Sequence, residues 1–166
     1  MLAAPAPYTA AVAFGGEGQF ELGTDGPKTI LVGVDDSTTS LRAASYAAGL
    51  ARRQGASVTV VYVAPMASLG AAAPGGADFA AARHQAFGQV AAAIRQRCED
   101  GSQDLGISIT FIAAEGDPFT EIRRIADEIR ADAVVVGASA QAGHRLIGSL
   151  AVRLVRAGRW PVTVVP

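Results

Sequence analysis

Cysteine and lysine are almost absent from this chain of 166 residues. Cys98 is the only cysteine, which excludes an intrachain disulfide and a cysteine-rich zinc site. Lys28 is the only lysine, and the other 13 of the 14 basic residues are arginines. Functions that need a lysine beyond position 28 are therefore excluded, including the phosphate-binding lysine of P-loop enzymes and Schiff-base catalysis.

An excess of charge of one sign is also lacking, and so are long apolar runs. The 14 basic and 15 acidic residues leave a formal net charge of −1, which gives no indication of a nucleic-acid or membrane partner. No stretch approaches the roughly 18 apolar residues of a membrane span. The N-terminus has no charged start, and Pro5 and Pro7 interrupt its apolar part, unlike in a secretory signal. We therefore expect a cytoplasmic protein.

The composition is instead dominated by small apolar residues. Half of the residues are hydrophobic, only 6% are aromatic, and 35 are alanine, which is typical of helices packed closely on a sheet. The length suits one domain with a single core. Residues 1–27 contain three prolines and five glycines, so we expect a flexible or loosely docked extension there and a folded domain over residues 28–166.

From Lys28 onward, apolar runs of strand length alternate with segments of helical periodicity. The runs predict strands at Thr29–Asp35, Ser57–Ala64, Ile107–Ala114, Ala133–Gly137 and Pro161–Val165. Helices are expected over Ser40–Gln54, from Asp78 to about Glu99, from Pro118, and over Ser149–Ala157. Nearly continuous apolar strands that alternate with helices indicate a parallel sheet covered on both faces. The fold class is therefore a doubly wound α/β domain.

Periodicity and capping residues also predict the buried helix faces and the helix ends. The first helix is expected to bury Leu41, Ala44, Ala48 and Ala51 and to end at Gly55. The second is expected to bury Phe79, Ala86, Phe87, Val90 and Ile94, and the third Phe119, Ile122, Ala126 and Ile129. Asp36 and Ser37 are expected to cap the first helix, and Asp117 the third, with Pro118 in its first turn.

A ligand site is expected where the carboxyl ends of the strands meet, at the point where the strand order reverses. The segments Val34–Ser37, Val63–Pro65, Glu115–Asp117 and the turn from Gly137 to Ser149 should converge there. Glycines in that turn let the backbone approach a phosphate, and the free amides at a helix start attract an anion. Ser149 can cap the helix and also donate its hydroxyl to a phosphate oxygen. The alternative is a plain strand–helix connection with Ser149 as its cap.

Together these features resemble the universal stress protein family over residues 28–166. The resemblance is carried by Ile30–Ser37, Glu115–Pro118, Val134–Gly137 with Gly148–Ser149, and Arg159–Val165. It implies a Rossmann-like domain with a five-stranded parallel sheet, usually a homodimer, and in one branch of the family ATP bound at the carboxyl ends of the strands.

The resemblance also implies which residues would bind the nucleotide. Asp35, beside Val34, would meet the adenosine, and Val63 would add an apolar or backbone contact. The ribose and the phosphates would lie against Gly137, Ala138, Gly148, Ser149 and Leu150, and Mg²⁺ would be shared among the phosphates. No catalytic residue and no metal-ligating side chain is predicted.

The turn departs from the ATP-binding pattern of that family, which is Gly, two residues, Gly, nine residues, then Gly followed by Ser or Thr. Ala140 stands at the second glycine, and only seven residues separate it from Gly148. The other branch of the family lacks the glycine pattern, does not bind ATP and acts through dimerisation. Two expectations therefore stand: an ATP-binding homodimeric regulatory module, and a dimeric stress-response module with a closed pocket.

The sequence does not favour an enzyme. The acidic pair Asp35 and Asp36 also occurs in phosphoacceptor receiver domains, but those need an aspartate at the end of strand three and a late lysine. Here strand three ends in Ala114 and Glu115. Neither histidine has the spacing of a serine or metal hydrolase, and nothing in the sequence supports ATP hydrolysis.

The last strand provides a physical reason to expect a dimer. Pro161–Val165 is short, rich in β-branched residues and the last segment of the sequence, so it should lie at a sheet edge with unpaired backbone groups. Pairing with its copy in a second subunit would satisfy those groups. We therefore expect a homodimer through this C-terminal edge strand.

Overall fold

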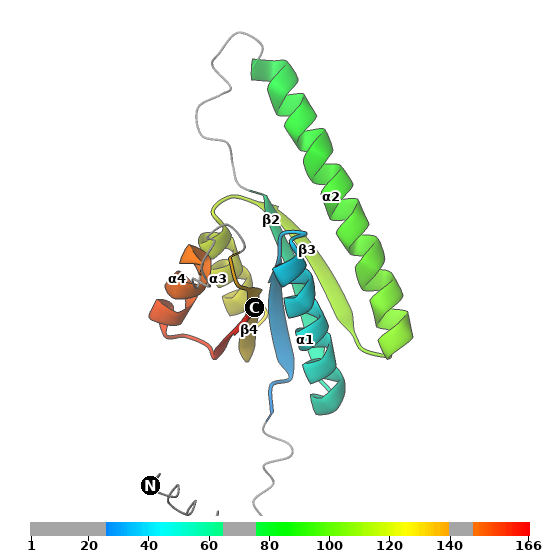
Figure 1. Ribbon diagram of the computed structural model, residues 1–166, viewed down its shortest axis with the longest axis vertical. Coiled ribbons are helices and arrows are strands. Elements are labelled where there is room, and N and C mark those ends of the chain that lie inside the picture. The colour runs from blue at the N-terminus through cyan, green and yellow to red at the C-terminus, as the bar shows by residue number, and fades with distance from the viewer. Residues whose placement is uncertain (1–25, 65–75, 140–147) are drawn as a thin grey trace, which may run out of the picture.

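The computed structural model describes residues 26–64, 76–139 and 148–166, so the expected N-terminal extension lies almost wholly outside the described residues. Five strands alternate with four helices along these ranges (Figure 1). The strands are β1 Thr29–Val34, β2 Ser57–Ala64, β3 Ile109–Glu115, β4 Ala133–Gly137 and β5 Val162–Val165. The helices are α1 Thr38–Gln54, α2 Gly76–Leu105, α3 Pro118–Glu128 and α4 Ser149–Ala157.

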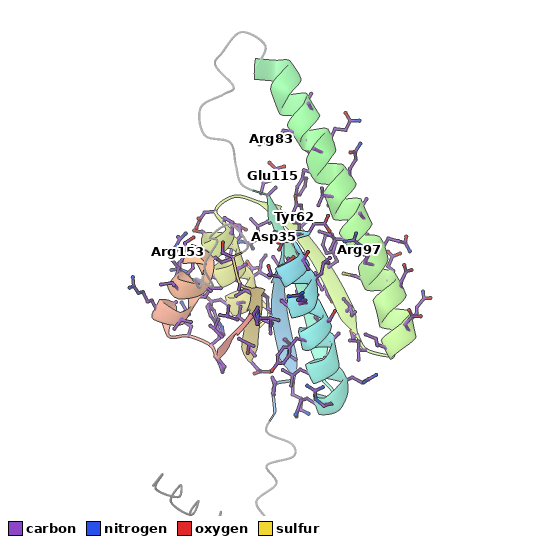
Figure 2. All side chains as sticks on the ribbon, viewed as in Figure 1. Asp35, Tyr62, Arg83, Arg97, Glu115 and Arg153 are labelled. Atoms are coloured by element: carbon purple, nitrogen blue, oxygen red, sulfur yellow. The ribbon has the colours of Figure 1, made fainter. Side chains whose placement is uncertain are left out.

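The five strands form one parallel sheet in the order β3-β2-β1-β4-β5. The chain winds outward from β1 to β3, then returns to the other side of β1 for β4 and β5. The strand order therefore reverses between β1 and β4, and all carboxyl ends lie at one end of the sheet, near Asp35 and Glu115 (Figure 2). The predicted doubly wound, five-stranded parallel α/β fold is confirmed, and β5 is an edge strand as expected.

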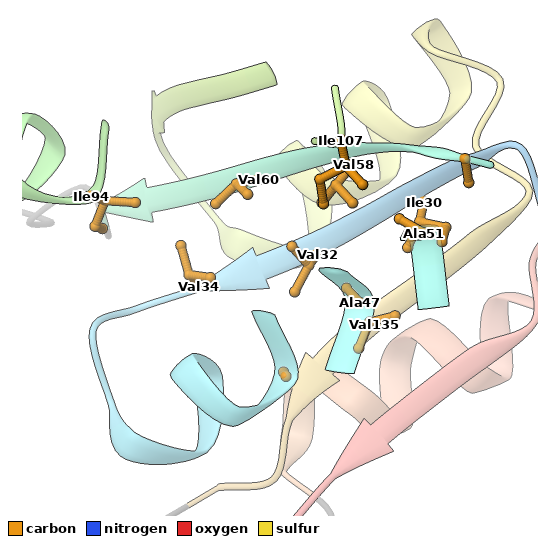
Figure 3. Close-up of a cluster of buried hydrophobic side chains, with 12 residues drawn as sticks. Ile30, Val32, Val34, Ala47, Ala51, Val58, Val60, Ile94, Ile107 and Val135 are labelled. Atoms are coloured by element: carbon orange, nitrogen blue, oxygen red, sulfur yellow. The ribbon is translucent and has the colours of Figure 1, made fainter. Parts of the chain in front are cut away.

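Apolar side chains on both faces explain why the strands read as continuous apolar runs. Alternate residues of a strand point to opposite faces, so Ile30 and Val32 contact α1 and α2, whereas Leu31 contacts α3 and α4. The first cluster also takes in Val58, Val60, Ile94 and Val135 (Figure 3). The second includes Val61, Ile122, Ile125, Val134, Ala151 and Leu154. A helix layer thus covers each face of the sheet.

The buried face of α1 differs from the prediction. The helix buries Ser40, Ala43, Ala47 and Ala51, while Leu41 is 40% exposed and Ala44 and Ala48 are only partly buried. Ala51 is buried as expected, and the other three buried residues each precede an expected one by one position, or about 100° of helix. The small alanines at these positions let the helix lie close to the sheet. Ser40 is tolerated in this face because its hydroxyl donates to the Ser37 carbonyl at 2.9 Å.

Helix α2 is longer than predicted and touches the sheet only in part. It continues past Glu99 to Leu105, and its N-terminal part projects beyond the sheet (Figure 1). Ile94 is buried, Val90 and Cys98 pack partly against the core, and the expected burial of Ala86 is wrong because that side chain is exposed. Phe87 is partly buried and stacks on Tyr62 with 5.6 Å between ring centroids. The side chain of Phe79 lies outside the described residues.

The remaining predictions of helix ends and faces are largely confirmed. Gly55 ends α1 in the left-handed conformation with φ 60°, and Asp117 caps α3 by accepting from the Thr120 amide at 3.0 Å. Helix α3 buries Ile122 and Ala126 as expected, but it also buries Ile125, whereas Phe119 and Ile129 are partly buried. No helix within the described ranges is long and apolar enough to cross a membrane.

Truncation of Leu154 to alanine should destabilise the fold strongly. Its side chain is fully buried between α4 and the sheet, whereas its neighbour Val155 is 56% exposed. Leu154→Ala should lower the free energy of unfolding by about 2 to 5 kcal/mol, measured by urea denaturation. Val155→Ala is the matched control and should change it by less than about 0.5 kcal/mol. Similar losses in the two variants would show that α4 does not pack as described.

Candidate functional site

A cavity of about 450 Å³ opens at the carboxyl ends of β1 and β4, where the strand order reverses. Its walls come from β1, β2 and β4 and from the first turns of α1, α3 and α4. All eight residues singled out in the sequence line it: Val34, Asp35, Val63, Gly137, Ala138, Gly148, Ser149 and Leu150. The fold thus brings together residues that lie more than a hundred positions apart in the sequence.

Asp35 is fixed at the mouth of this cavity by the first turn of α1. Its Oδ1 accepts hydrogen bonds from the Ser37 amide at 3.1 Å and the Ser37 hydroxyl at 2.5 Å. Partial burial raises the pKa of Asp35, but the hydrogen bonds with Ser37 and Ser40 outweigh that effect and hold the pKa below its ordinary value. The carboxylate is therefore ionised at neutral pH, and within the described ranges no hydrogen bond reaches its Oδ2.

The neighbouring carboxylate points elsewhere. Ser37 is the N-cap of α1 and accepts from the Ser40 amide at 3.2 Å, so the expected cap role is confirmed for Ser37 and wrong for Asp36. Asp36 adopts a left-handed backbone with φ 64°, and its Oδ1 accepts from Arg97 at 2.6 Å. Because of the left-handed backbone at Asp36, the two carboxylates point in different directions. Of the two, only Asp35 lines the cavity.

The start of α4 differs from the starts of α1 and α3. Its N-cap is Gly148, with no side-chain hydrogen bond to the helix amides from the described residues, and Ser149 is already the first helical residue. The expectation that Ser149 caps α4 is therefore wrong, because the non-helical backbone lies one residue earlier. Among the described residues, no side chain accepts from the first amides of α4 as Ser37 and Asp117 do at the starts of α1 and α3. Such a helix start attracts an anion.

Several cavity residues were not identified from the sequence. They are Gly33, Thr39, Ser40, Val61, Pro118, Ile122, Val136 and Ala151, whereas Ser37 and Ser139 belong to segments that were expected to converge here. Val61 could have been found, because it lies two residues before Val63 and must share its face of β2. Ile122 could not, because its place depends on how α3 packs on the sheet. Within the described part of the chain, no three His, Cys, Asp or Glu side chains gather closely enough to hold a metal ion.

Comparisons with known proteins bear on this arrangement. The sequence profile of the universal stress protein family matches residues 26–166. The chain belongs to this family. A universal stress protein of Methanocaldococcus jannaschii is 30% identical over 141 residues, which cover 83% of this chain and 81% of that protein.

Solved structures of the family have the same fold. The universal stress protein UspA from Lactobacillus plantarum superposes with a TM-score of 0.73 at 24% identity, covering 84% of this chain and 97% of that one. A universal stress protein solved in complex with cAMP has a TM-score of 0.61 at 24% identity, covering 84% and 97% of the two chains. At this level of identity the likeness shows the fold alone.

Two glycines of the family's turn have a packing role here in addition to any contact with a ligand. A Cβ atom on Gly137 would lie 2.6 Å from the Thr39 carbonyl carbon and 2.7 Å from the Ser40 amide nitrogen. A Cβ atom on Gly148 would lie 2.9 Å from the Ser139 Cβ. The first glycine therefore lets α1 approach β4, and the second lets the two ends of the turn meet. Ala140 and residues 141–147 lie outside the described residues.

Gly137→Ala should destabilise the universal stress protein domain even without a ligand. The added methyl group would collide with backbone atoms of α1, so the free energy of unfolding should fall by about 1 to 3 kcal/mol. Gly88→Ala is the matched control, because a Cβ on Gly88 meets nothing within 4 Å. In the interior of α2 this change should raise stability by about 0.5 to 1 kcal/mol. Urea denaturation measures both, and equal effects of the two variants would contradict the packing role of Gly137.

Proposed function

We propose that the cavity binds an adenine nucleotide, with ATP as the expected form, and that the protein is a homodimeric regulatory module rather than an enzyme. One observation carries the proposal: an ionised aspartate and a helix start that receives no side-chain cap from the described residues face the same cavity, where the strand order reverses. This is the position where open α/β sheets bind nucleotides. The volume also falls within the usual range of small-molecule sites.

The adenosine end would lie toward β1 and β2. Val34, Val61 and Val63 supply apolar surface there, and Ile122 adds to it from α3. Asp35 presents Oδ2 as a charged acceptor, which suits a hydroxyl of the ribose or the amino group of adenine. An apolar slot with one charged acceptor at its mouth fits a nucleoside better than it fits a simple anion.

The phosphate end would lie at the start of α4. The backbone of Gly148, Ser149 and Leu150 borders the cavity, and the Ser149 side chain supplies a hydroxyl. Mg²⁺ would enter with the phosphates and complete its coordination with water, as it does at many nucleotide sites. The cAMP complex of a structural neighbour supports an adenine nucleotide, and the resemblance to the ATP-binding branch favours the triphosphate.

A second candidate is a dimeric module that binds no nucleotide. It is favoured by Ala140 at the second glycine position and by the turn that is two residues short. The nucleotide released by denaturing gently purified protein, identified by mass spectrometry, decides between the two together with calorimetric titration of ATP. Bound or titratable ATP supports the first candidate, and neither signal at millimolar nucleotide supports the second.

Asp35→Asn should weaken the binding of ATP, AMP and adenosine by the same factor, about tenfold or more, because the carboxylate would contact the adenosine. Asparagine keeps an oxygen for Ser37 but replaces the charged second acceptor with a donor. Asp36→Asn is the matched control, since Asp36 does not line the cavity and asparagine tolerates the left-handed backbone. Calorimetry measures all affinities, and equal effects of the two variants would contradict the assignment of Asp35.

The dimer would form through the free edge of β5. The Val134 amide donates to the Pro161 carbonyl and the Ala138 amide to the Val165 carbonyl, so residues 161, 163 and 165 direct their backbone groups toward β4. Val162 and Val164 therefore direct theirs away from the sheet, because backbone direction alternates along a strand. A second copy that pairs with this edge would satisfy those groups.

Val164→Pro should abolish the dimer and leave the monomer folded, because it removes an amide that faces the open edge. Thr163→Pro should destabilise the monomer itself, because the Thr163 amide faces β4. Sedimentation velocity at tens of micromolar measures the mass, and circular dichroism measures folding. A wild-type protein that sediments only as a monomer, or a Val164→Pro variant that remains a dimer, would contradict this interface.

A further inference from the structure

An ion pair joins Asp117, the N-cap of α3, to Arg153 in the middle of α4. Arg153 Nη1 lies 3.0 Å from Asp117 Oδ2, and Arg153 Nη2 lies 3.0 Å from Asp117 Oδ1. The guanidinium also lies over the Phe119 ring, 4.3 Å from its centroid. Hydrogen bonds from Arg153 and Thr120 lower the pKa of Asp117 to about 2. Asp117 is therefore a full carboxylate at neutral pH, and Arg153 neutralises it.

Arg153 belongs to the helix whose start borders the proposed phosphate position, although neither Arg153 nor Asp117 lines the cavity. Arg153 follows Ser149 by four residues, so both lie on one face of α4, and long helical side chains extend toward the helix N-terminus. Its partner Asp117 directly precedes Pro118, which lines the cavity together with Ser149. The arginine thus lies about one helical turn from Ser149 and is paired with the residue that precedes Pro118.

The chemistry of this pair allows an exchange of partners. Both side chains are about half exposed, with exposed fractions of 49% for Arg153 and 45% for Asp117, so solvent weakens their attraction. Asp117 keeps its hydrogen bonds from Thr120 without Arg153. A guanidinium fits two phosphate oxygens as well as it fits two carboxylate oxygens. A terminal phosphate carries more charge than the carboxylate and can therefore compete for the same donors.

We propose that Arg153 is a specificity-determining residue that leaves Asp117 to contact the terminal phosphate of the bound nucleotide, so that affinity increases with the number of phosphates. The proposal rests on the proposed function of the cavity. Asp117 acts as the internal competitor: it holds Arg153 in place in the free protein and repels phosphates that reach it without the arginine.

This role predicts effects of opposite sign for the two partners. Loss of the Arg153 charge removes a phosphate contact and leaves the Asp117 carboxylate unneutralised beside the phosphates. Loss of the Asp117 charge frees Arg153 and removes the repulsion. If the ion pair only holds α3 and α4 together, both variants should bind nucleotide more weakly, or neither should change the affinity.

Calorimetric titration of the full chain with ATP, ADP, AMP and adenosine tests the exchange. Arg153→Gln should weaken ATP binding about tenfold, weaken AMP less and leave adenosine unchanged. Asp117→Asn should strengthen ATP binding about two- to threefold, because asparagine still caps α3. Arg156→Gln is the matched control, since it removes a charge from the last turn of the same helix and should not alter the ratio of ATP to AMP affinity.

The outcomes separate this proposal from the one on which it rests. If the unmodified protein binds ATP but Arg153→Gln lowers the affinity for all four ligands equally, the proposed exchange of partners is wrong and the assignment of the cavity stands. A loss of ATP affinity in Asp117→Asn also overturns the exchange and indicates that the ion pair only holds α3 and α4 together. If the unmodified protein binds none of the four ligands, both proposals fall.

Discussion

The close approach of α1 to β4 at Gly137 is the constraint on which the candidate site depends. Backbone atoms of Thr39 and Ser40 occupy the space that any side chain at position 137 would need. This contact sets the first turn of α1 against the end of β4, and Ser37 in that turn holds Asp35. Gly137 in β4 therefore determines the position of the Asp35 carboxylate after β1, although the two residues are far apart in the sequence.

Small side chains also determine how closely α1 packs on the sheet in the core. Ala43, Ala47 and Ala51 present methyl groups to the sheet, so α1 lies close enough to cover Ile30, Val32 and Val135 with little apolar mass. On the other face, larger side chains from α3 and α4, such as Ile122 and Leu154, fill a deeper layer. The cavity opens on this second side, where Ile122 and Ala151 reach its wall.

The sequence predicted those parts of the fold in which a single physical rule determines the structure. Strands buried on both faces read as apolar runs, and parallel strands bring their carboxyl ends together, so topology predicted where the cavity lies. The resemblance to the universal stress protein family then supplied the eight predicted residues, all of which line it. Most of the buried face of α1 was predicted wrongly because alanines occur on several faces of this helix. Alanine does not indicate which of these faces is buried. The polar end of α2 was missed because a helix that runs along solvent has no apolar stripe to show its length. The Arg153–Asp117 pair joins residues 36 positions apart, and no local pattern indicates it.

The two ends of the cavity depend on different parts of the chain, and this separation bears on the shortened turn. The proposed adenosine end would be built by β1, β2 and α3, all of which lie within the described residues. Only the phosphate end adjoins that turn, through Ala138, Ser139 and Gly148. Under the proposed function, a loss of two residues and of one glycine would therefore act on phosphate contacts and would leave the nucleoside slot unchanged. A charged side chain from the body of α4 can replace contacts that a longer turn would make with its backbone. If Arg153 supplies such a donor, the composition of the turn alone does not determine whether the domain binds a nucleotide.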